Sequence, residues 1–471
     1  MAKYKAYPEY KDSGVEWLGE IPNHWIRSKF GYLKTILTDY TANGSFADLK
    51  SNVTYLDEPS YARLVRLTDL RHDLNNSNGV WIDKNSYNYL GKSSLYGGEF
   101  LLANVGAYAG LFYQMPYNKG PASLAPNMFM AKFSPEKTSR KFIAYVGQAD
   151  NISKQLMLKA TASSAQPKLN KDDFKSIFCC YPPLNEQTKI SVFLDHETAK
   201  IDNLIEKQQQ LIELLKEKRQ AVISHAVTKG LNPDVPMKDS GVEWLGKVPE
   251  HWTIAQLKFN TIEMQTGPFG SQLHAEDYVV DGIPLINPAH MNAGMIIPDP
   301  KVTVDEATQE RLGRHKLSEG EIIFSRRGEL GRCAVVKKNN EGWLCGTGSL
   351  KAKLTKKIIP DYAYTLISSE GVVSELTLES KGSTMANLNT ETLGRIRLPV
   401  PPISEQEAIL DYIKIISDKY DYLIRSADTA IRLMQERRTA LISAAVTGKI
   451  DVRDWVAPDT QNVEEPQEAT A

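Results

Sequence analysis

The sequence predicts an α+β protein in which two α/β domains are joined by two long helices, with the whole plan occurring twice along the chain. Two observations predict this fold. A fifteen-residue segment is repeated, and each copy is followed by short β-rich runs and then by a long heptad pattern that begins after two prolines. The chain has 471 residues, too many for a single core, since domains usually hold about 100–200 residues.

The repeated segment reads KDSGVEWLGEIPNHW from Lys11 to Trp25 and KDSGVEWLGKVPEHW from Lys238 to Trp252. Only three of the fifteen positions differ, and almost half of the chain separates the two copies. Solenoid repeats have much shorter periods of roughly 20–50 residues, so each copy introduces a whole half of the protein. Its glycines and proline predict a turn-rich arm that is anchored by tryptophan and leucine side chains.

The same order of segments follows each arm. Each arm leads into a globular stretch, which we call head 1 or head 2, and each head leads into a long helix. The predicted segments are an N-terminal arm (1–25), head 1 (26–180), a first spacer helix (181–230), a linker with the second arm (231–252), head 2 (253–399), a second spacer helix (400–449) and a disordered acidic tail (450–471).

Both heads have the mixed pattern of α/β domains. Head 1 has β-rich runs at Ala62–Leu67, Phe100–Val105 and Asn127–Phe133 and a helical pattern at Ser139–Met157, and head 2 has comparable runs such as Glu321–Phe324. The net charge of the chain is −1, but head 1 carries 19 Lys and Arg against 12 Asp and Glu. That surplus is a modest electrostatic footprint for a polyanion partner, whereas head 2 is balanced.

The stretches that follow YPPLNEQ at Tyr181 and VPPISEQ at Val400 predict coiled-coil helices. Apolar residues recur at heptad positions a and d, and the two stretches align without a gap, with Leu194 matched to Ile413. Prolines restrict the residue before them and fit the start of a helix. The predicted coiled-coil core consists of Leu194, Ile201, Leu204, Leu211 and Leu215 in the first helix and Ile413, Ile416, Tyr420, Leu423 and Met434 in the second.

Catalytic motifs are scarce. An amino-methyltransferase needs an Asn/Asp-Pro-Pro-aromatic motif for the flipped base, and neither prolyl motif supplies it. A glycine-rich cofactor loop and a Cys/His metal cluster are also missing from the sequence, so we expect no metal and no cofactor to be bound by this chain. One pattern, Asp361 followed by Glu379 and Lys381, fits a PD-(D/E)xK nuclease that holds Mg²⁺, with solvated charges as the alternative.

Two loops just before each head closes are the best candidates for DNA contact. Thr161–Asn170 aligns with Gly382–Asn389, and both are rich in hydroxyl and amide side chains that can donate to phosphates or pair with adenine. The candidate DNA-binding residues are Gln166, Lys168, Asn170, Arg326, Arg327, Ser383, Thr384, Asn387 and Asn389. A capped structural turn is the alternative for the loops, and a solvated surface pair is the alternative for the two arginines.

The order of arm, head, PPLxEQ-led helix, arm, head and PPIxEQ-led helix resembles the specificity subunit of type I restriction-modification enzymes. The resemblance covers nearly the whole chain to about Lys449. It implies that each head is a target-recognition domain that reads one half of a split site in double-stranded DNA. It also implies that the helices pack antiparallel, set the length of the unread spacer and dock two modification (methyltransferase) subunits, which restriction (motor and nuclease) subunits join.

The resemblance therefore predicts a DNA-recognition subunit without catalysis of its own. Its partners would use S-adenosylmethionine, ATP and Mg²⁺. The sequence holds no eighteen-residue apolar run, no apolar signal segment and no CxxC pair among its four cysteines, which predicts a cytoplasmic protein without a membrane partner. The nuclease above and a coiled-coil adaptor with no DNA role are the alternatives.

Overall fold

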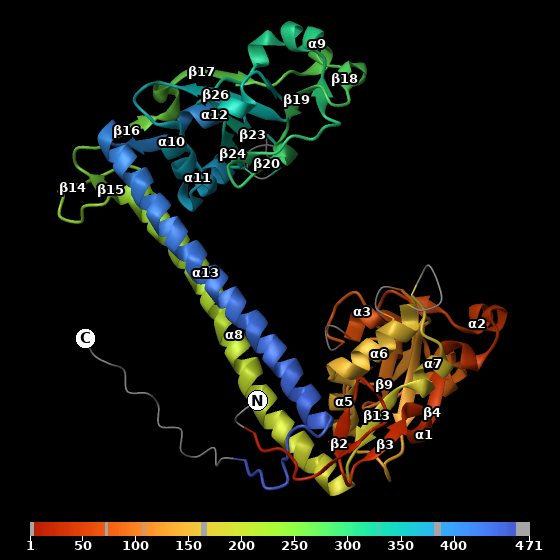
Figure 1. The fold of residues 1–471 in the computed structure, drawn as a ribbon. Coiled ribbons are helices and arrows are strands. Elements are labelled where there is room, and N and C mark those ends of the chain that lie inside the picture. Colours follow the sequence, from red (N-terminus) through yellow and green to blue (C-terminus); the bar gives the residue numbers. More distant parts are fainter. Residues whose placement is uncertain are drawn as a thin grey trace. The chain divides into compact units, whose positions relative to one another are not determined.

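The computed structural model describes residues 4–70, 74–106, 109–161, 167–328, 330–380 and 388–457, with Ser271, Glu379 and Ser380 described in their backbone only. The chain forms two compact units. Unit 1 comprises Met1–Gln209 and Thr429–Ala471, and unit 2 comprises Gln210–Asp428. Each unit contains one arm, one head and part of each long helix (Figure 1).

Head 1 is built on two sheets. The first is antiparallel, with the order β10 (Phe112–Gln114), β9 (Phe100–Ala103), β12 (Met128–Phe133) and β4 (Lys34–Asp39). The second has the order β5 (Tyr55–Leu56), β7 (Val80–Ile82), β6 (Ala62–Val65), β11 (Ala122–Leu124) and β8 (Ser94–Leu95). Among these strands only β6 and β11 pair in parallel. The β-rich runs predicted at Ala62–Leu67, Phe100–Val105 and Asn127–Phe133 are confirmed, since they contain β6, β9 and β12.

Head 2 repeats this topology with different residues. Its first sheet has the order β24 (Cys333–Val335), β23 (Ile322–Ser325), β26 (Ser349–Leu354) and β17 (Thr261–Thr266). Its second has the order β18 (Tyr278–Val279), β22 (Thr303–Val304), β19 (Ile283–Ile286) and β25 (Leu344–Cys345), and β19 and β25 are parallel. The parallel pair β19–β25 therefore corresponds to β6–β11.

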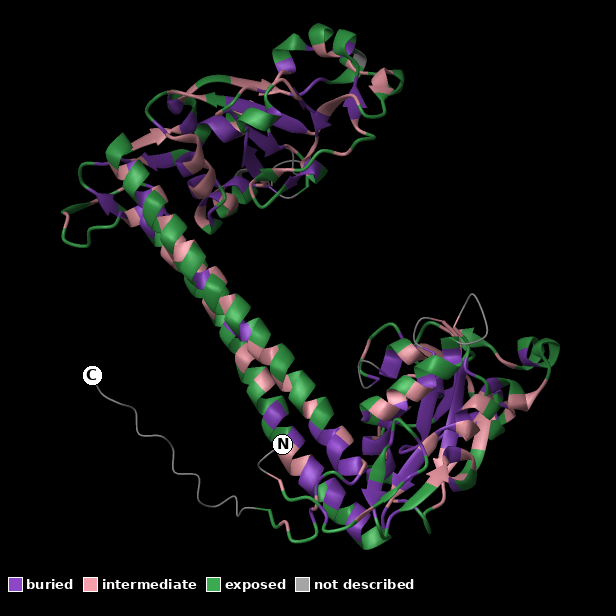
Figure 2. Ribbon diagram, viewed as in Figure 1, coloured by how far each residue is buried: buried purple, intermediate pink, exposed green. Residues whose placement is uncertain are grey.

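Alternation along the central strand joins the two sheets and the helices into one head. In β9, Phe100 and Leu102 pack in the cluster formed with the head's helices, whereas Leu101 packs against the second sheet. In β23, Ile322 and Phe324 face the helices, and the residue between them faces the second sheet. Figure 2 shows the sheets of both heads as buried and the outer faces of the long helices as exposed.

Short helices complete each head. Head 1 contains α1 (Phe30–Leu33), α2 (Phe46–Asn52), α3 (Leu67–Leu70), α4 (Lys84–Tyr89), α5 (Arg140–Gln148), α6 (Asp150–Thr161) and α7 (Lys171–Ser176), and head 2 contains α9 (Glu306–Arg311), α10 (Pro360–Ile367), α11 (Glu370–Ser380) and α12 (Thr390–Arg395). The single helix predicted at Ser139–Met157 is wrong in one respect. It breaks at Ala149, whose ψ of 138° is extended and ends α5 before α6 begins.

Each arm is a β-hairpin, and a short pair of strands after it begins and ends the head. The first arm pairs β1 (Tyr10–Asp12) with β2 (Glu20–Pro22), and the second pairs β14 (Met237–Asp239) with β15 (Lys247–Pro249). Each turn has glycines in the left-handed region, Gly14 at φ +67° and Gly241 at φ +68°, which explains why the repeat keeps them. Strands β3 (Ile26–Lys29) and β13 (Phe178–Tyr181) close head 1, and β16 (Thr253–Gln256) and β27 (Arg397–Val400) close head 2.

The repeated His-Trp motif of each arm meets the repeated Glu of the prolyl motif, a contact we call the arm lock. In unit 1, Glu186 accepts hydrogen bonds from Trp25 Nε1 at 2.9 Å and from the Tyr7 hydroxyl at 2.5 Å, and it lies 2.8 Å from His24 Nε2. In unit 2, Glu405 accepts from Trp252 Nε1 at 3.0 Å and lies 2.8 Å from Nε2 of the neighbouring histidine. The arm lock thus gives both repeated motifs one structural role.

The glutamine that follows each lock glutamate ties the long helix to its head. Gln187 is fully buried, accepts from the Ser139 backbone N–H at 2.8 Å, and donates to the carbonyls of Lys137 and Pro182 at 2.8 Å each. Gln406 makes the same three kinds of contact in unit 2. A buried amide with all these groups paired fixes the direction in which the helix leaves the head.

The long helices are α8 (Leu184–Lys229), of 46 residues, and α13 (Ile403–Val446), of 44 residues. In unit 1 they run antiparallel, since Asp202 pairs with Arg438 at 2.8 Å while Lys189, earlier in α8, donates to the carbonyl of Arg453, beyond the end of α13. Unit 2 has the equivalent ion pair, in which Arg219 Nη1 lies 2.8 Å from Asp421. The alignment of the two helices matches Asp202 with Asp421 and Arg219 with Arg438, so the repeat carries the ion pair in both halves.

The predicted coiled-coil core is partly wrong. Leu194, Ile201 and Tyr420 are buried and Leu215, Ile413, Ile416 and Met434 are half-buried, but Leu204, Leu211 and Leu423 are 51%, 42% and 36% exposed. The predicted frame placed the second core position three residues after each a position. The structure places it four residues after, at Ile205, Ile212 and Ile424, so the neighbouring leucines face outward.

Candidate nucleic-acid interface

Strand direction brings several loop starts of head 1 to one edge, which we call the strand-end edge. Because β6 and β11 are parallel, their carboxyl ends lie together, and β12 begins shortly after β11 ends. Strand β9 runs antiparallel to β12 and ends at the same edge, where the Asn104 backbone N–H donates to the carbonyl of Asn127 at 3.0 Å. Residues that follow β6, β9 and β11 therefore share this edge.

Head 2 has the equivalent edge. The parallel strands β19 and β25 end together, and the Gly346 backbone N–H donates to the carbonyl of Ile286 at 2.9 Å. Strand β23 ends beside them, where the Arg326 backbone N–H donates to the carbonyl of Gly348 at 2.9 Å. The prediction that Arg326 follows a strand is therefore confirmed, and its side chain is half-buried with Nε 3.3 Å from the carbonyl of Leu388.

The described ends of the loops predicted to contact DNA lie at these edges. The Leu169 backbone N–H donates to the carbonyl of Asn104 at 2.9 Å, and the Leu388 backbone N–H donates to the carbonyl of Arg326 at 2.8 Å. The two bonds are equivalent in the two heads. The structure thus brings Lys168, which is exposed, next to the end of β9, and it brings Leu388, in the described end of the second loop, next to Arg326, which the exposed Arg327 follows.

Part of the predicted set lies outside the described residues, namely Gln166, Ser383, Thr384 and Asn387. Asn170 and Asn389 are described and have a structural role. The Asn170 side chain accepts from the backbone N–H of Asp173 at 2.8 Å at the start of α7, and that of Asn389 accepts from the backbone N–H of Thr392 at 2.8 Å at the start of α12. The capped turn is therefore present, and base contact by these two residues stays a prediction.

The sequence reasoning missed the residues that follow β6 and β19. Arg66 and Asn287 occupy equivalent positions, and in both the residue three positions later accepts a hydrogen bond from their backbone N–H. Asp69 Oδ2 does so at 2.8 Å and His290 Nδ1 at 3.2 Å. The available signal was a polar residue at the end of a β-rich run with a side-chain acceptor three residues on, which is typical of a capped turn.

Both heads contain a salt bridge between a buried glutamate and a lysine of the first sheet. Glu321, which directly precedes β23, is buried and pairs with the buried Lys351 at 3.1 Å, and Glu99 pairs with Lys132 at 3.4 Å in head 1. Each glutamate also accepts from backbone N–H groups of the preceding turn. These pairs are satisfied inside the heads and belong to the scaffold that positions the strand-end edges.

The residues of the nuclease pattern are only partly described. Asp361 lies in the first turn of α10 and pairs with Lys337 at 2.6 Å, while the side chain of Glu379 and all of Lys381 lie outside the described residues. In the described part of the chain, no three His, Cys, Asp or Glu side chains gather where they could hold a metal ion. No described helix combines the length and the apolar character that crossing a bilayer requires.

Comparison with known proteins gives one family. The model of the type I restriction modification DNA specificity domain matches residues 68–214 and 261–425, one stretch in each half. The chain is 22% identical to the specificity subunit of the type I restriction enzyme EcoKI of Escherichia coli K12, across 96% of this chain and 95% of that protein. It is also 22% identical to the putative MjaX specificity subunit of Methanocaldococcus jannaschii, across 93% of this chain and 96% of that protein.

Solved structures agree on the fold. A chain from a study of complex assembly and conformational transition of the type I R-M system superposes with a TM-score of 0.61 at 14% identity, covering 91% of this chain and 99% of that one. The HsdS subunit of Thermoanaerobacter tengcongensis gives a TM-score of 0.50 at 13% identity, covering 91% and 98%. Because the family model matches well over half of the residues, this chain belongs to the type I restriction modification DNA specificity domain family.

Proposed function

We propose that this chain is the DNA specificity subunit of a type I restriction-modification complex and that each head reads one part of a bipartite site in double-stranded DNA. The observation that carries the proposal is the pair of strand-end edges, which have the same backbone connections and different side chains. Arg66 and Asn104 stand in head 1 where Asn287 and Arg326 stand in head 2. Two readers of one design with unlike side chains suit two unlike half-sites.

The chain itself is proposed to be non-catalytic. Methyl transfer would be done by modification subunits that bind S-adenosylmethionine, and translocation and cleavage by restriction subunits that use ATP and Mg²⁺. The exposed leucines of the long helices support two equivalent docking sites for the modification subunits. Unit 1 exposes Leu204 and Leu433, and unit 2 exposes Leu423 and Leu214, which are their respective counterparts in the aligned helices.

Exchange of one head tests the proposal. Residues 26–178 are replaced by the corresponding head of another member of the family, and the complex with modification subunits is expressed in a host that lacks other methyltransferases. Long-read methylation mapping is expected to show a new sequence in one half of the site and the original sequence in the other. A change in both halves, or methylation that follows no sequence, contradicts the proposal.

A further inference from the structure

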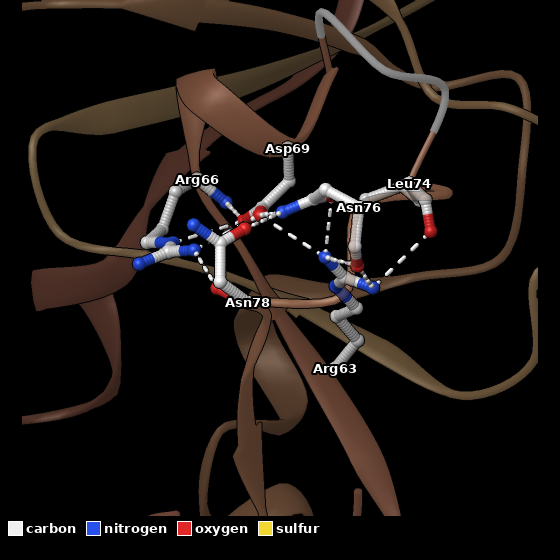
Figure 3. A network of polar contacts seen from close by, with 6 residues as sticks. All are labelled: Arg63, Arg66, Asp69, Leu74, Asn76 and Asn78. Atoms are coloured by element: carbon white, nitrogen blue, oxygen red, sulfur yellow. Dashed lines mark hydrogen bonds and ion pairs between the residues drawn. The ribbon is translucent and has the colours of Figure 1, made fainter. Parts of the chain in front are cut away.

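A buried carboxylate orders the polar groups that follow β6 in head 1. Asp69 is 0% exposed and accepts hydrogen bonds from Arg63 Nη2 at 3.1 Å and Asn76 Nδ2 at 2.8 Å. Arg66 approaches from the other side, with Nε and Nη2 each 3.0 Å from a carboxylate oxygen. Figure 3 shows the Asp69 carboxylate between the two guanidinium groups, with Asn76 and Asn78 beside them.

The two arginines are held in different ways. The Arg63 side chain is 8% exposed, donates to the carbonyl of Leu74 at 3.1 Å and lies over the ring of Trp81 at 5.5 Å, so it is part of the interior. The Arg66 side chain is 36% exposed. Its Nη2 also donates to the carbonyl of Asn78 at 2.7 Å, and its Nη1 has no hydrogen bond with any described residue.

The network carries a net positive charge. Burial alone raises the pKa of Asp69, but hydrogen bonds from Arg66, Asn76 and Arg63 outweigh it and lower the pKa of this carboxyl to about 2. Asp69 is therefore ionised at neutral pH, and its hydrogen bonds raise the pKa of Arg66. One carboxylate faces two guanidinium groups, so one positive charge is left over, and the partly exposed Arg66 is where solvent or a ligand can meet it.

The N–H groups of Arg66 that remain free determine which DNA group this side chain can bind. Reading guanine takes two donors at the end of the guanidinium, one on each terminal nitrogen. Both hydrogens of Nη2 are already directed to Asp69 and to Asn78, so only Nη1 remains for a ligand. Nη1 carries two N–H groups on one nitrogen, which fit the oxygens of a phosphate group and form strong charge-assisted hydrogen bonds with them.

Pre-organisation favours the same use. A surface arginine gives up about 2 kcal/mol of rotamer entropy when a ligand fixes it. The contacts to Asp69 and Asn78 have already fixed Arg66 in the free protein, so binding loses less. In head 2 the equivalent residue is Asn287, whose Oδ1 accepts from the Gly348 backbone N–H at 3.2 Å and which has no charge to offer.

We infer that Arg66 is a preset phosphate clamp of head 1, which grips the DNA backbone through Nη1 at the strand-end edge, and that the uncharged Asn287 takes its place in head 2. Accepting the proposed function, the ligand is the duplex that head 1 reads. A phosphate contact fixes how the head sits on the duplex and adds affinity for every sequence, whereas base contacts elsewhere on the edge choose the sequence.

The test compares Arg66→Gln with Lys34→Gln in the complex with modification subunits. Lys34 opens β4 opposite Phe133, at the end of β12 that lies away from the strand-end edge, so its removal subtracts the same charge elsewhere. Affinity for a cognate duplex and for a scrambled duplex is measured between about 50 and 200 mM salt. Arg66→Gln is expected to weaken both about tenfold and to reduce the slope of log K against log salt by about 0.9, with no slope change in Lys34→Gln.

Methylphosphonate substitution makes the test independent of the variant's folding. One neutral linkage at a time is placed along the cognate duplex, and wild-type protein is expected to lose about tenfold at one or two positions near the half-site of head 1. Methylphosphonate at those positions should not lower the affinity of Arg66→Gln any further. A relaxed base preference in Arg66→Gln, an unchanged salt slope, or losses that add fully to the variant overturns the clamp. Absence of any cognate preference in wild-type protein overturns the proposed function instead.

Discussion

Replacing Glu186 by alanine is expected to destabilise unit 1 by about 2–6 kcal/mol, because two buried donors lose their acceptor. Glu186 is 6% exposed and its Oε1 accepts from two buried donors, the indole of Trp25 and the hydroxyl of Tyr7, which are 0% and 4% exposed. Without the carboxylate both donors are left unpaired, at about 1–3 kcal/mol each. His24 adds little, because its side chain is 41% exposed and can turn to water.

The second arm lock supplies a matched control within the same chain. Among the described residues Glu405 accepts from one buried donor, the indole of Trp252, and from His251, whose side chain is 47% exposed. Glu405→Ala is therefore expected to destabilise unit 2 by about 1–3 kcal/mol. Glu186→Gln keeps an oxygen where the two donors converge, so it should be milder than Glu186→Ala.

Urea unfolding of the full chain, followed by near-ultraviolet circular dichroism and by limited proteolysis that reports on each unit, measures these losses. A double-mutant cycle of Glu186→Ala with Trp25→Phe should show strong coupling, because phenylalanine has no N–H donor that the loss of Glu186 could leave unpaired. The reasoning is refuted if Glu405→Ala costs as much as Glu186→Ala, or if Glu186→Ala costs less than about 1 kcal/mol. Either result would mean that the number of buried donors left unpaired does not determine the loss of stability.

Two further predictions concern charge. Asp202→Arg places a second cation beside Arg438 and is expected to lower the stability by about 1 kcal/mol, measured by thermal unfolding. Adding Arg438→Asp should restore most of that loss. A double variant that is no more stable than the single one argues against the ion pair. Asp69 has its pKa lowered from 3.8 to about 2, so it contributes about 2 kcal/mol above pH 4 that is lost as the pH falls toward 2. Because other carboxyls such as Asp39 and Asp451 also have lowered pKa values, urea unfolding between pH 2 and 5 should show a weaker pH dependence in Asp69→Asn than in wild type, and equal slopes would refute the prediction.

The order of arms, heads and helices could be predicted because it depends on repetition, which needs no knowledge of contacts. The frame of the long helices could not, because Leu204 and Leu211 are each followed by isoleucine. Two adjacent apolar residues satisfy the pattern in either frame, and only the partner helix decides which of them faces inward. The structure also places Arg219 on the inner stripe, where its ion pair with Asp421 replaces an apolar contact that the pattern would have required.

The candidate interface was predictable in its loops and not in its network. The alignment of the two closing loops showed that they share a role, and the caps made by Asn170 and Asn389 give that role a structural form. Arg66 contacts Asp69, which is three residues on, and the carbonyl of Asn78, which reaches it only after the chain turns back between β6 and β7. Spacing in the sequence does not encode that return.

Comparison of the two halves separates the residues that build the frame from those suited to reading DNA. The arm-lock glutamates and the capping asparagines Asn170 and Asn389 are identical in both halves, and they share the indole contact and the N-cap contact, as a common scaffold requires. Arg66 and Asn287 occupy one backbone position and differ in charge and in hydrogen bonding. Two halves that must recognise different sequences have to differ somewhere, and the strand-end edges are where the same backbone carries unlike side chains. Because Arg66 is assigned to the DNA backbone, base readers are better sought among the other unlike pairs at these edges, such as Asn104 and Arg326, than among the shared loop residues.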